Sequence, residues 1–103
     1  MNKEPIVVLV DSDLETLIPL FLASRAQDLE GLAKGLAAHD LTALRGIGHD
    51  MKGTGSSFGF DAVSAMGDRI EIAAIAGDVE AITVQFAVFK DYLARVEIRY
   101  VAS

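Results

Sequence analysis

A histidine and a lysine three residues apart are the side chains of this sequence best suited to chemistry. His49 precedes Lys52 within the run Gly48-His49-Asp50-Met51-Lys52-Gly53, and the apolar spacing on both sides predicts a helix there. A neutral imidazole keeps a lone pair on one ring nitrogen, and that nitrogen can attack phosphorus. Three residues of helix rise about 4.5 Å. The Lys52 ammonium can therefore offset the negative charge of a phosphoryl group on His49.

Glycines surround this pair at a cost to the stability of the helix. Gly46, Gly48, Gly53 and Gly55 would each cost about 1 kcal/mol relative to alanine in a helix interior. The sum of roughly 4 kcal/mol is large against the roughly 5 to 15 kcal/mol that stabilises a typical domain. Helical spacing divides the four: Gly48 and Gly55 should face the core and permit close packing. Gly46 and Gly53 should flank His49 and let a partner approach the ring.

The plain alternative is that His49 is a surface histidine beside a surface lysine, with the glycines in a loop. The glycine cost and the position of Lys52 favour the functional interpretation. His39 has no such surroundings, since it lies at a helix end before Asp40, where a solvated role is expected. Around His49 we expect a partner to contact small and basic residues, namely Arg45, Gly46, Gly53, Ser56 and Ser57.

Two rival chemistries involve the same region. The run from Gly55 to Gly59 fits the G-x-S-x-G pattern of serine hydrolases, but that elbow requires a preceding strand and a large α/β sheet. A metal site is disfavoured because the chain has no cysteine, only two histidines and no Glu-x-x-His pair. A hydrolase or metal-dependent enzyme that uses His49 with Ser57 or nearby carboxylates remains an alternative.

Composition limits the class of protein. The 103 residues are 51% hydrophobic, so we expect one globular domain over residues 1–103. The formal charge of −6 argues against a general nucleic-acid binder, which needs a basic surface. The apolar run Ile6 to Val10 is too short for a signal-peptide core, and no stretch approaches the length that crosses a bilayer. We therefore expect a cytoplasmic protein without a membrane partner.

The apolar periodicity predicts four helices within residues 13–101. Pro19 should lie near the start of the first helix or mark a kink. We expect Asp40, Asp61 and Asp78 to cap the second, third and fourth helices, with Gly59 and Gly77 ending the second and third. The expected buried stripe of the first helix is Ile18, Leu22, Leu29 and Leu36, and that of the second is Leu41, Leu44, Gly48, Met51, Gly55 and Phe58. In the third helix it is Val63, Met66, Ile70 and Ala74, and in the fourth it is Ile82, Phe86, Phe89, Leu93, Val96 and Tyr100.

Short connections make sequential helices antiparallel, so the predicted fold is all-α, an up-down antiparallel four-helix bundle. Residues 1–12 should form a short extended N-terminal segment. Ile6 to Val10 resembles a strand, but no second strand is apparent in the sequence. We expect the segment to lie against the bundle, and strand pairing in a dimer is the alternative.

The run from His49 to Phe60, HDMKGTGSSFGF, resembles the signature of histidine-containing phosphotransfer (HPt) domains, in which H-x-x-K-G opens a Gly/Ser stretch that ends in F-G. The resemblance extends over almost the entire chain, since HPt domains are four-helix bundles with the histidine on the second helix. It implies a phosphorelay carrier in two-component signalling. By this resemblance His49 is the phosphorylated residue, Lys52 is its charge partner, and Gly53 keeps the ring accessible.

Glu71 falls where many HPt domains place a glutamine or another polar residue that hydrogen-bonds the histidine. A carboxylate there could hold one ring nitrogen protonated and leave the other nucleophilic, but it would also repel an incoming phosphoryl group. A solvated carboxylate on the third helix is an equal alternative. The sequence also departs from the HPt pattern at three positions. Gly48 stands where alanine or serine is usual, Met51 where leucine is usual, and Thr54 where serine is usual.

The resemblance implies response-regulator receiver domains as partners, with a hybrid sensor kinase as a further candidate. We expect no cofactor of the protein's own, because a receiver would supply Mg²⁺ at its acidic site. We also expect no autokinase activity, a free-standing monomer, and an apolar edge to the docking surface at Ile47 or Ile75. The alternative function is a regulatory module that binds receivers without being phosphorylated.

Overall fold

The computed structural model describes residues 3–102 of the chain. It contains four α-helices, two short 3-10 helices and two strands. In chain order these are β1 (Ile6–Asp11), η1 (Ser12–Leu14), α1 (Ile18–Ala38), α2 (Leu41–Thr54), η2 (Ser56–Phe58), α3 (Asp61–Ala76), α4 (Val79–Arg95) and β2 (Val96–Val101).

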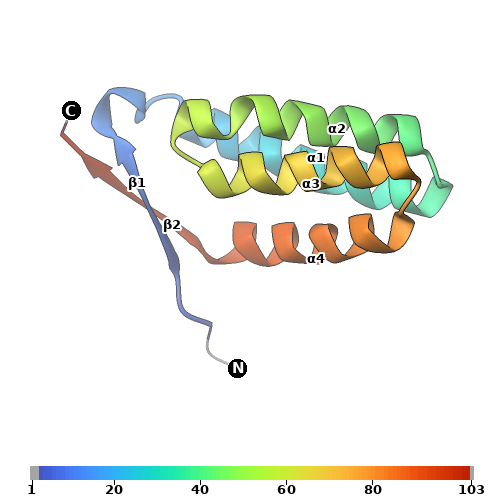
Figure 1. The fold of residues 1–103 in the computed structure, drawn as a ribbon. Coiled ribbons are helices and arrows are strands. Elements are labelled where there is room, and N and C mark those ends of the chain that lie inside the picture. The colour runs from blue at the N-terminus through green and yellow to red at the C-terminus, as the bar shows by residue number, and fades with distance from the viewer. Residues whose placement is uncertain (1–2, 103) are drawn as a thin grey trace.

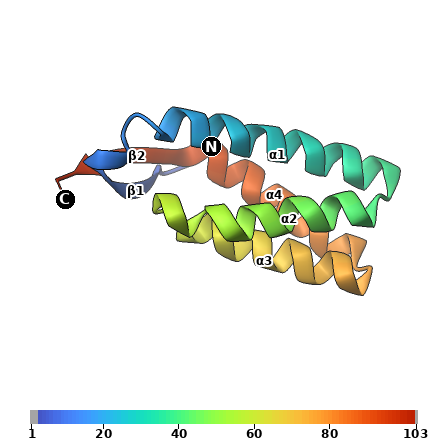
Figure 2. The same ribbon diagram turned by 90° about the horizontal axis from the view of Figure 1, so that it is seen from above.

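The four helices lie side by side, and consecutive helices run in opposite directions (Figures 1 and 2). The packing between α2 and α3 is the most extensive of any helix pair. None of the helices in residues 3–102 has both the length and the apolar character needed to cross a membrane. The core is built from buried side chains of all four helices and β1, among them Val10, Ile18, Leu32, Leu44, Met51, Val63, Ile70, Ile82 and Phe89.

Most of the predicted helix ends are confirmed. The Asp40 and Asp78 carboxylates each accept a hydrogen bond of 3.0 Å from a backbone N–H in the first turn of α2 and α4. Gly77 ends α3 with φ of 72°. The prediction for Asp61 is wrong: it is the first residue of α3, and Phe60 holds the cap position without a side-chain hydrogen bond.

Of two other predicted helix ends, the one at Pro19 is confirmed and the one at Gly59 differs in detail. Pro19 is the second residue of α1, where its missing N–H removes no intrahelical hydrogen bond. The α-helical part of α2 ends at Thr54, and the 3-10 turn Ser56–Phe58 carries the chain on to Gly59, which has φ of 90°.

The buried face of α1 is rotated by about one residue from the predicted stripe. Ile18 is buried as predicted. Phe21 and Leu32 are also buried, whereas the predicted Leu22, Leu29 and Leu36 are only partly buried. The first helix contacts both α2 and α4, so its apolar face is wide. Tertiary packing then decides which part of that face reaches the centre of the core.

The strand pair corrects the prediction at both ends of the chain. The fourth helix ends at Arg95, so the helical range 13–101 and the all-α class are wrong for residues 96–101. The segment Val96–Val101 instead pairs in parallel with β1, from Ile6 opposite Val96 to Asp11 opposite Val101. The N-terminal strand thus has a partner within the same chain. The misprediction arose because the spacing of four between Val96 and Tyr100 fits a strand of period two as well as a helix.

Candidate functional site

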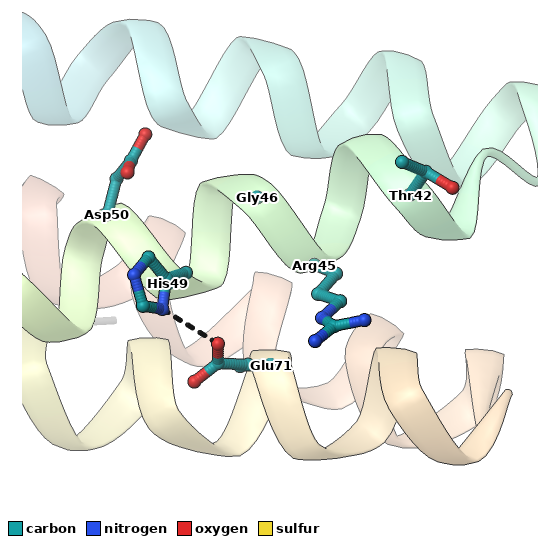
Figure 3. Close-up of a pocket in the computed structure, with 6 residues that line it drawn as sticks. All are labelled: Thr42, Arg45, Gly46, His49, Asp50 and Glu71. Atoms are coloured by element: carbon teal, nitrogen blue, oxygen red, sulfur yellow. Dashed lines mark hydrogen bonds and ion pairs between the residues drawn. The ribbon is translucent and has the colours of Figure 1, made fainter.

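His49 projects from the middle of α2 toward solvent on the side of α3 (Figure 3). Gly48 and Met51 on the same helix are buried, which turns position 49 away from the core. Its side chain is 70% exposed. A group on another protein can therefore reach the ring directly.

The backbones of α2 and α3 come very close beside His49. A Cβ atom on Gly48 would lie 2.8 Å from both the Glu71 backbone nitrogen and the Gly67 carbonyl oxygen. A Cβ atom on Gly67 would lie 2.5 Å from the Lys52 backbone nitrogen and 2.6 Å from the Gly48 carbonyl oxygen. Real Cβ atoms do not approach backbone atoms so closely, so only glycine fits on either side. This contact brings the part of α3 that carries Glu71 up to His49.

Glu71 holds one nitrogen of the imidazole ring. Its Oε2 lies 2.8 Å from His49 Nδ1 (Figure 3). The hydrogen bond with His49, and secondarily the nearby Lys52, lowers the pKa of the Glu71 carboxyl below its ordinary value, so the group is ionised at neutral pH. An ionised carboxylate can only accept hydrogen bonds. Nδ1 therefore carries the proton, and in the neutral ring the lone pair is on Nε2.

Lys52 lies between two carboxylates of α3. Its Nζ is 3.1 Å from Asp68 Oδ1 and 3.4 Å from Glu71 Oε1. The hydrogen bond with Asp68 is the main cause that raises the pKa of Lys52, and this keeps the ammonium charged. Asp68 was not predicted from the sequence. Its spacing of three from Glu71, on one face of the third helix, was the signal that could have revealed it.

An open hollow of about 480 Å³ lies beside His49. Arg45 and Gly46, both predicted as partner contacts, line it, and so do Thr42 and Asp50, which were not predicted. The Arg45 side chain extends toward α3, whereas Asp50 points toward α1 (Figure 3). The charged side chains that line the hollow are therefore one cation, Arg45, and two anions, Asp50 and Glu71.

The four glycines of the motif fall into the two predicted groups. Gly46 and Gly53 have open space where a Cβ atom would stand, while Gly48 and Gly55 meet α3 and its preceding turn. Gly46, Gly48 and Gly53 all belong to α2, and Gly55 follows its last residue. The alternative that these glycines mark a loop is therefore wrong.

Ser56 and Ser57 lie in the 3-10 turn beyond α2 and do not line the hollow. The backbone N–H of Ser56 donates to Ser64 Oγ over 2.8 Å, and Ser64 Oγ in turn donates to the Lys52 carbonyl. The G-x-S-x-G run continues a helix and follows no strand, so it lacks the geometry of a hydrolase elbow. Among residues 3–102, no three His, Cys, Asp or Glu side chains gather in a way that could hold a metal ion.

A buried arginine supports α2 from the side of α1. Arg25 donates from Nε to Asp28 over 2.6 Å and from Nη1 to Thr54 Oγ1 over 2.7 Å. Thr54 Oγ1 donates to the Asp50 carbonyl, so the network reaches the residue next to His49. Burial raises the pKa of Asp28 despite the neighbouring guanidinium. Arg25 was not predicted as part of the site, although it is seven residues after Ile18 and therefore on the same side of the helix.

The two apolar residues proposed for the edge of the docking surface differ in exposure. Ile47 is partly buried, and its Cδ1 lies 2.9 Å from where a Cβ atom on Gly31 would stand. Ile75 is 61% exposed and Ile72 is 58% exposed. Of the two predicted residues, Ile75 is the one that a partner can reach.

A family model described as "Hpt domain" matches residues 16–98. The chain therefore belongs to the Hpt domain family, whose members are histidine phosphotransfer carriers of two-component phosphorelays and interact with receiver domains. The resemblance noted from the His49 motif is thereby confirmed. No curated protein and no solved structure matches the chain.

Proposed function

We propose that the protein is a phosphorelay carrier that accepts a phosphoryl group on His49 from a receiver-domain aspartate and passes it to another receiver. The observation that carries this proposal is the exposed imidazole whose Nδ1 is held by Glu71 at 2.8 Å. That hydrogen bond directs the Nε2 lone pair away from Glu71. The Hpt family match supports the same chemistry.

In the proposed step, His49 Nε2 attacks the phosphorus of an aspartyl phosphate. The N–P bond forms as the bond between phosphorus and the aspartate oxygen breaks, and the aspartate leaves as a carboxylate. The Nδ1 proton stays on the ring, held by Glu71. Transfer to the next receiver reverses these bond changes. Mg²⁺ supplied by the receiver stabilises the transferring group.

Lys52 is proposed to balance the charge of the phosphorylated ring. A phosphoryl group brings about −1.5 to −2 charges at neutral pH, and Glu71 repels it. The Lys52 ammonium contacts Asp68 and Glu71 in the structure, and a flexible lysine can exchange an exposed carboxylate for a phosphoryl oxygen. Glu71 therefore orients the ring at an electrostatic cost that Lys52 reduces.

The proposed docking surface surrounds the ring. It comprises the open glycines Gly46 and Gly53, the cation Arg45, and the exposed Ile72 and Ile75 at one edge. The partners are receiver domains, including one on a hybrid sensor kinase. We expect labelling to require a phosphorylated partner, because the carrier has no kinase activity of its own. A cytoplasmic location is part of this proposal.

The first test is labelling of His49. Mixing the protein with a receiver that carries a labelled aspartyl phosphate should give acid-labile phosphate on wild type and none on a His49→Gln variant. His39→Gln removes the only other histidine and should label like wild type. Unchanged labelling of His49→Gln would overturn the proposal. A wild type that binds receivers but takes no label would instead favour the non-phosphorylated regulatory module.

The second test concerns Lys52. Replacing it with alanine should slow transfer about tenfold, a loss of about 1.4 kcal/mol of transition-state stabilisation, with an unchanged helical signal in circular dichroism. Lys90→Ala removes an exposed lysine of α4 and is the matched control. Equal transfer rates for the two variants would exclude a specific role for Lys52.

A further inference from the structure

The two strands have very different outer faces. In β1 the outward side chains Val7 and Leu9 are 42% and 62% exposed. In β2 the residues beside them are Glu97 and Arg99, whose side chains form an ion pair of 2.9 Å. The exposed face of β1 is thus apolar along Val7 and Leu9, whereas that of β2 carries the Glu97–Arg99 ion pair, followed by Val101 at its end, which is 43% exposed.

The backbone of β1 also has a free edge. Among residues 3–102, the sheet contains β1 and β2 only, so the side of β1 away from β2 has no strand beside it. The strand pair extends past the end of the bundle at which α1 begins and α2 ends (Figures 1 and 2). No strand of the described residues occupies this edge. The turn at Gly59 comes close to the strand, since a Cβ atom there would lie 3.7 Å from the Leu9 carbonyl oxygen.

This arrangement is unusual for a finished sheet. Parallel strands generally occur in sheets with both faces covered, and a sheet of two strands has little stability of its own. Exposed edges are usually protected by a charged side chain or proline within the strand. In β1 the only charged residue is the last one, Asp11, and Pro5 precedes the first, so the five residues between them, Ile6 to Val10, contain neither. The sheet thus has the features of one that is completed by a further strand.

The sequence of β1 favours a second copy of the same strand as that partner. Antiparallel pairing centred on Val8 places Val7 opposite Leu9 of the second copy, so the apolar faces coincide. It also places Lys3, which pairs with Asp91 of its own chain in the structure, opposite Asp13 of the second copy, and Glu4 opposite Ser12. Parallel pairing would instead place Asp11 beside Asp11 of the second copy. The antiparallel arrangement avoids this contact between like charges, because Asp11 then lies opposite Pro5, and it is favoured for that reason.

We infer that two copies of the protein associate through antiparallel pairing of their β1 strands. The resulting sheet has four strands in the order β2, β1, β1, β2, and the interface is two-fold symmetric, as in most homodimers. No strand residue lines the hollow beside His49, so both phosphorylation sites stay accessible. This inference is independent of the proposed function, and it replaces the expectation of a monomer.

The first experiment measures self-association of the full chain by sedimentation velocity, from about 10 µM to about 1 mM, because a small interface binds weakly. Wild type should form a dimer within this range. A Leu9→Lys variant, with a charge on the exposed face of β1, should raise the dimer dissociation constant at least tenfold. The matched control is Val84→Lys, at a valine of α4 that is 55% exposed, and it should associate like wild type.

Two results would overturn the inference. One is a wild type that stays monomeric over the whole range. The other is a dimer that survives Leu9→Lys but is weakened by Val84→Lys, which would place the interface on the helices. Circular dichroism of Leu9→Lys verifies that the variant folds, as expected for a substitution at an exposed position.

The second experiment tests the register, because the chain has no natural cysteine. Val7→Cys and Leu9→Cys variants are mixed and oxidised gently. Antiparallel pairing centred on Val8 predicts that disulfides join the two different variants in preference to two identical chains. A preference for identical chains, or crosslinking no faster than for a Val84→Cys control, would contradict the proposed pairing.

Discussion

The glycines on the buried side of α2 and those on its exposed side have different roles, although they belong to one helix. A Cβ atom on Gly48 would meet the backbone of α3 at 2.8 Å, whereas one on Gly46 or Gly53 would have nothing within 4 Å. Each glycine lowers helix propensity, by an amount that is largest in the helix interior. On the buried side a close helix contact offsets the cost. On the exposed side no contact within the chain does so, and the benefit has to come from access to His49.

The contact between α2 and α3 also determines the geometry of the site. The backbone nitrogen of Glu71 is one of the atoms nearest to the missing Cβ of Gly48, and the Glu71 side chain holds His49. Packing and chemistry are thus coupled on this side of the helix. The exposed glycines can change without moving Glu71.

The largest effect is expected from closing the space at Gly48. Gly48→Ala should lower the free energy of unfolding by about 1 to 3 kcal/mol, because the methyl group meets backbone atoms that cannot move independently. It should also weaken the hydrogen bond between His49 and Glu71 by pushing the helices apart. Thermal unfolding measures the first effect, and the imidazole NMR signals of His49 measure the second.

Gly67→Ala is the reciprocal substitution on α3 and should act in the same direction. If either variant were as stable as wild type, the helices would be able to separate at no cost. The contrast between the buried and exposed glycines would then lose its physical basis.

A smaller effect of opposite sign is expected at the open glycines. Gly46→Ala should raise the free energy of unfolding by up to about 1 kcal/mol, which corresponds to a melting temperature about 4 to 8 °C higher. Gly53→Ala should gain less, since it lies in the last turn of α2.

At Gly46 and Gly53, side chains that stabilise the helix should slow phosphoryl transfer. A larger side chain, in Gly53→Leu, should slow transfer from a receiver by roughly tenfold, equivalent to about 1.4 kcal/mol, while the fold is retained. Transfer assays on Gly53→Leu, alongside the stabilised Gly46→Ala and Gly53→Ala variants, provide the measurement. Transfer at the wild-type rate in Gly53→Leu would show that this glycine does not serve access.

The smallest effect concerns the pH dependence of stability. Since the pKa of Glu71 is lower in the folded protein than its ordinary value of 4.5, its ionised form stabilises the fold above about pH 4.5, and this contribution disappears as the pH falls through the folded-state pKa. The advantage of wild type over Glu71→Gln should therefore shrink on acidification. Chemical denaturation at several pH values measures it.

The same titration links the two sides of the comparison. In the Gly48→Ala background the hydrogen bond between His49 and Glu71 is weakened. The substitution Glu71→Gln should then change the free energy of unfolding at low pH less than it does in wild type. A pH dependence that is unchanged by Gly48→Ala would mean that the helix contact does not position Glu71.

Local sequence was sufficient for much of the helical framework. Asp40, Asp78 and Gly77 act at the helix ends as predicted, since capping depends on residues within one turn. The division of the glycines likewise follows from helical spacing alone. His49 and Lys52 lie near each other because they are three residues apart on one helix, which separates them by a rise of only about 4.5 Å.

Contacts between distant residues could not be read in the same way. Glu71 was suggested only by the family resemblance, and Asp68 and Ser64 were missed, because their partners lie on a different helix. The burial of Arg25 depends on Thr54, which is 29 residues away. A pattern of apolar positions reports which face is buried, but not which polar groups meet across an interface.

Residue patterns along the chain were thus enough to establish four helices, most of their ends, and an accessible histidine with a lysine one turn away. It took the packed fold to bring Glu71 to the Nδ1 side of the ring and Asp68 to Lys52. The fold also made Val96–Val101 leave the helix and pair with β1. The spacing of Val96 and Tyr100 suits both a helix and a strand, so the choice between them depends on a partner strand some ninety residues earlier.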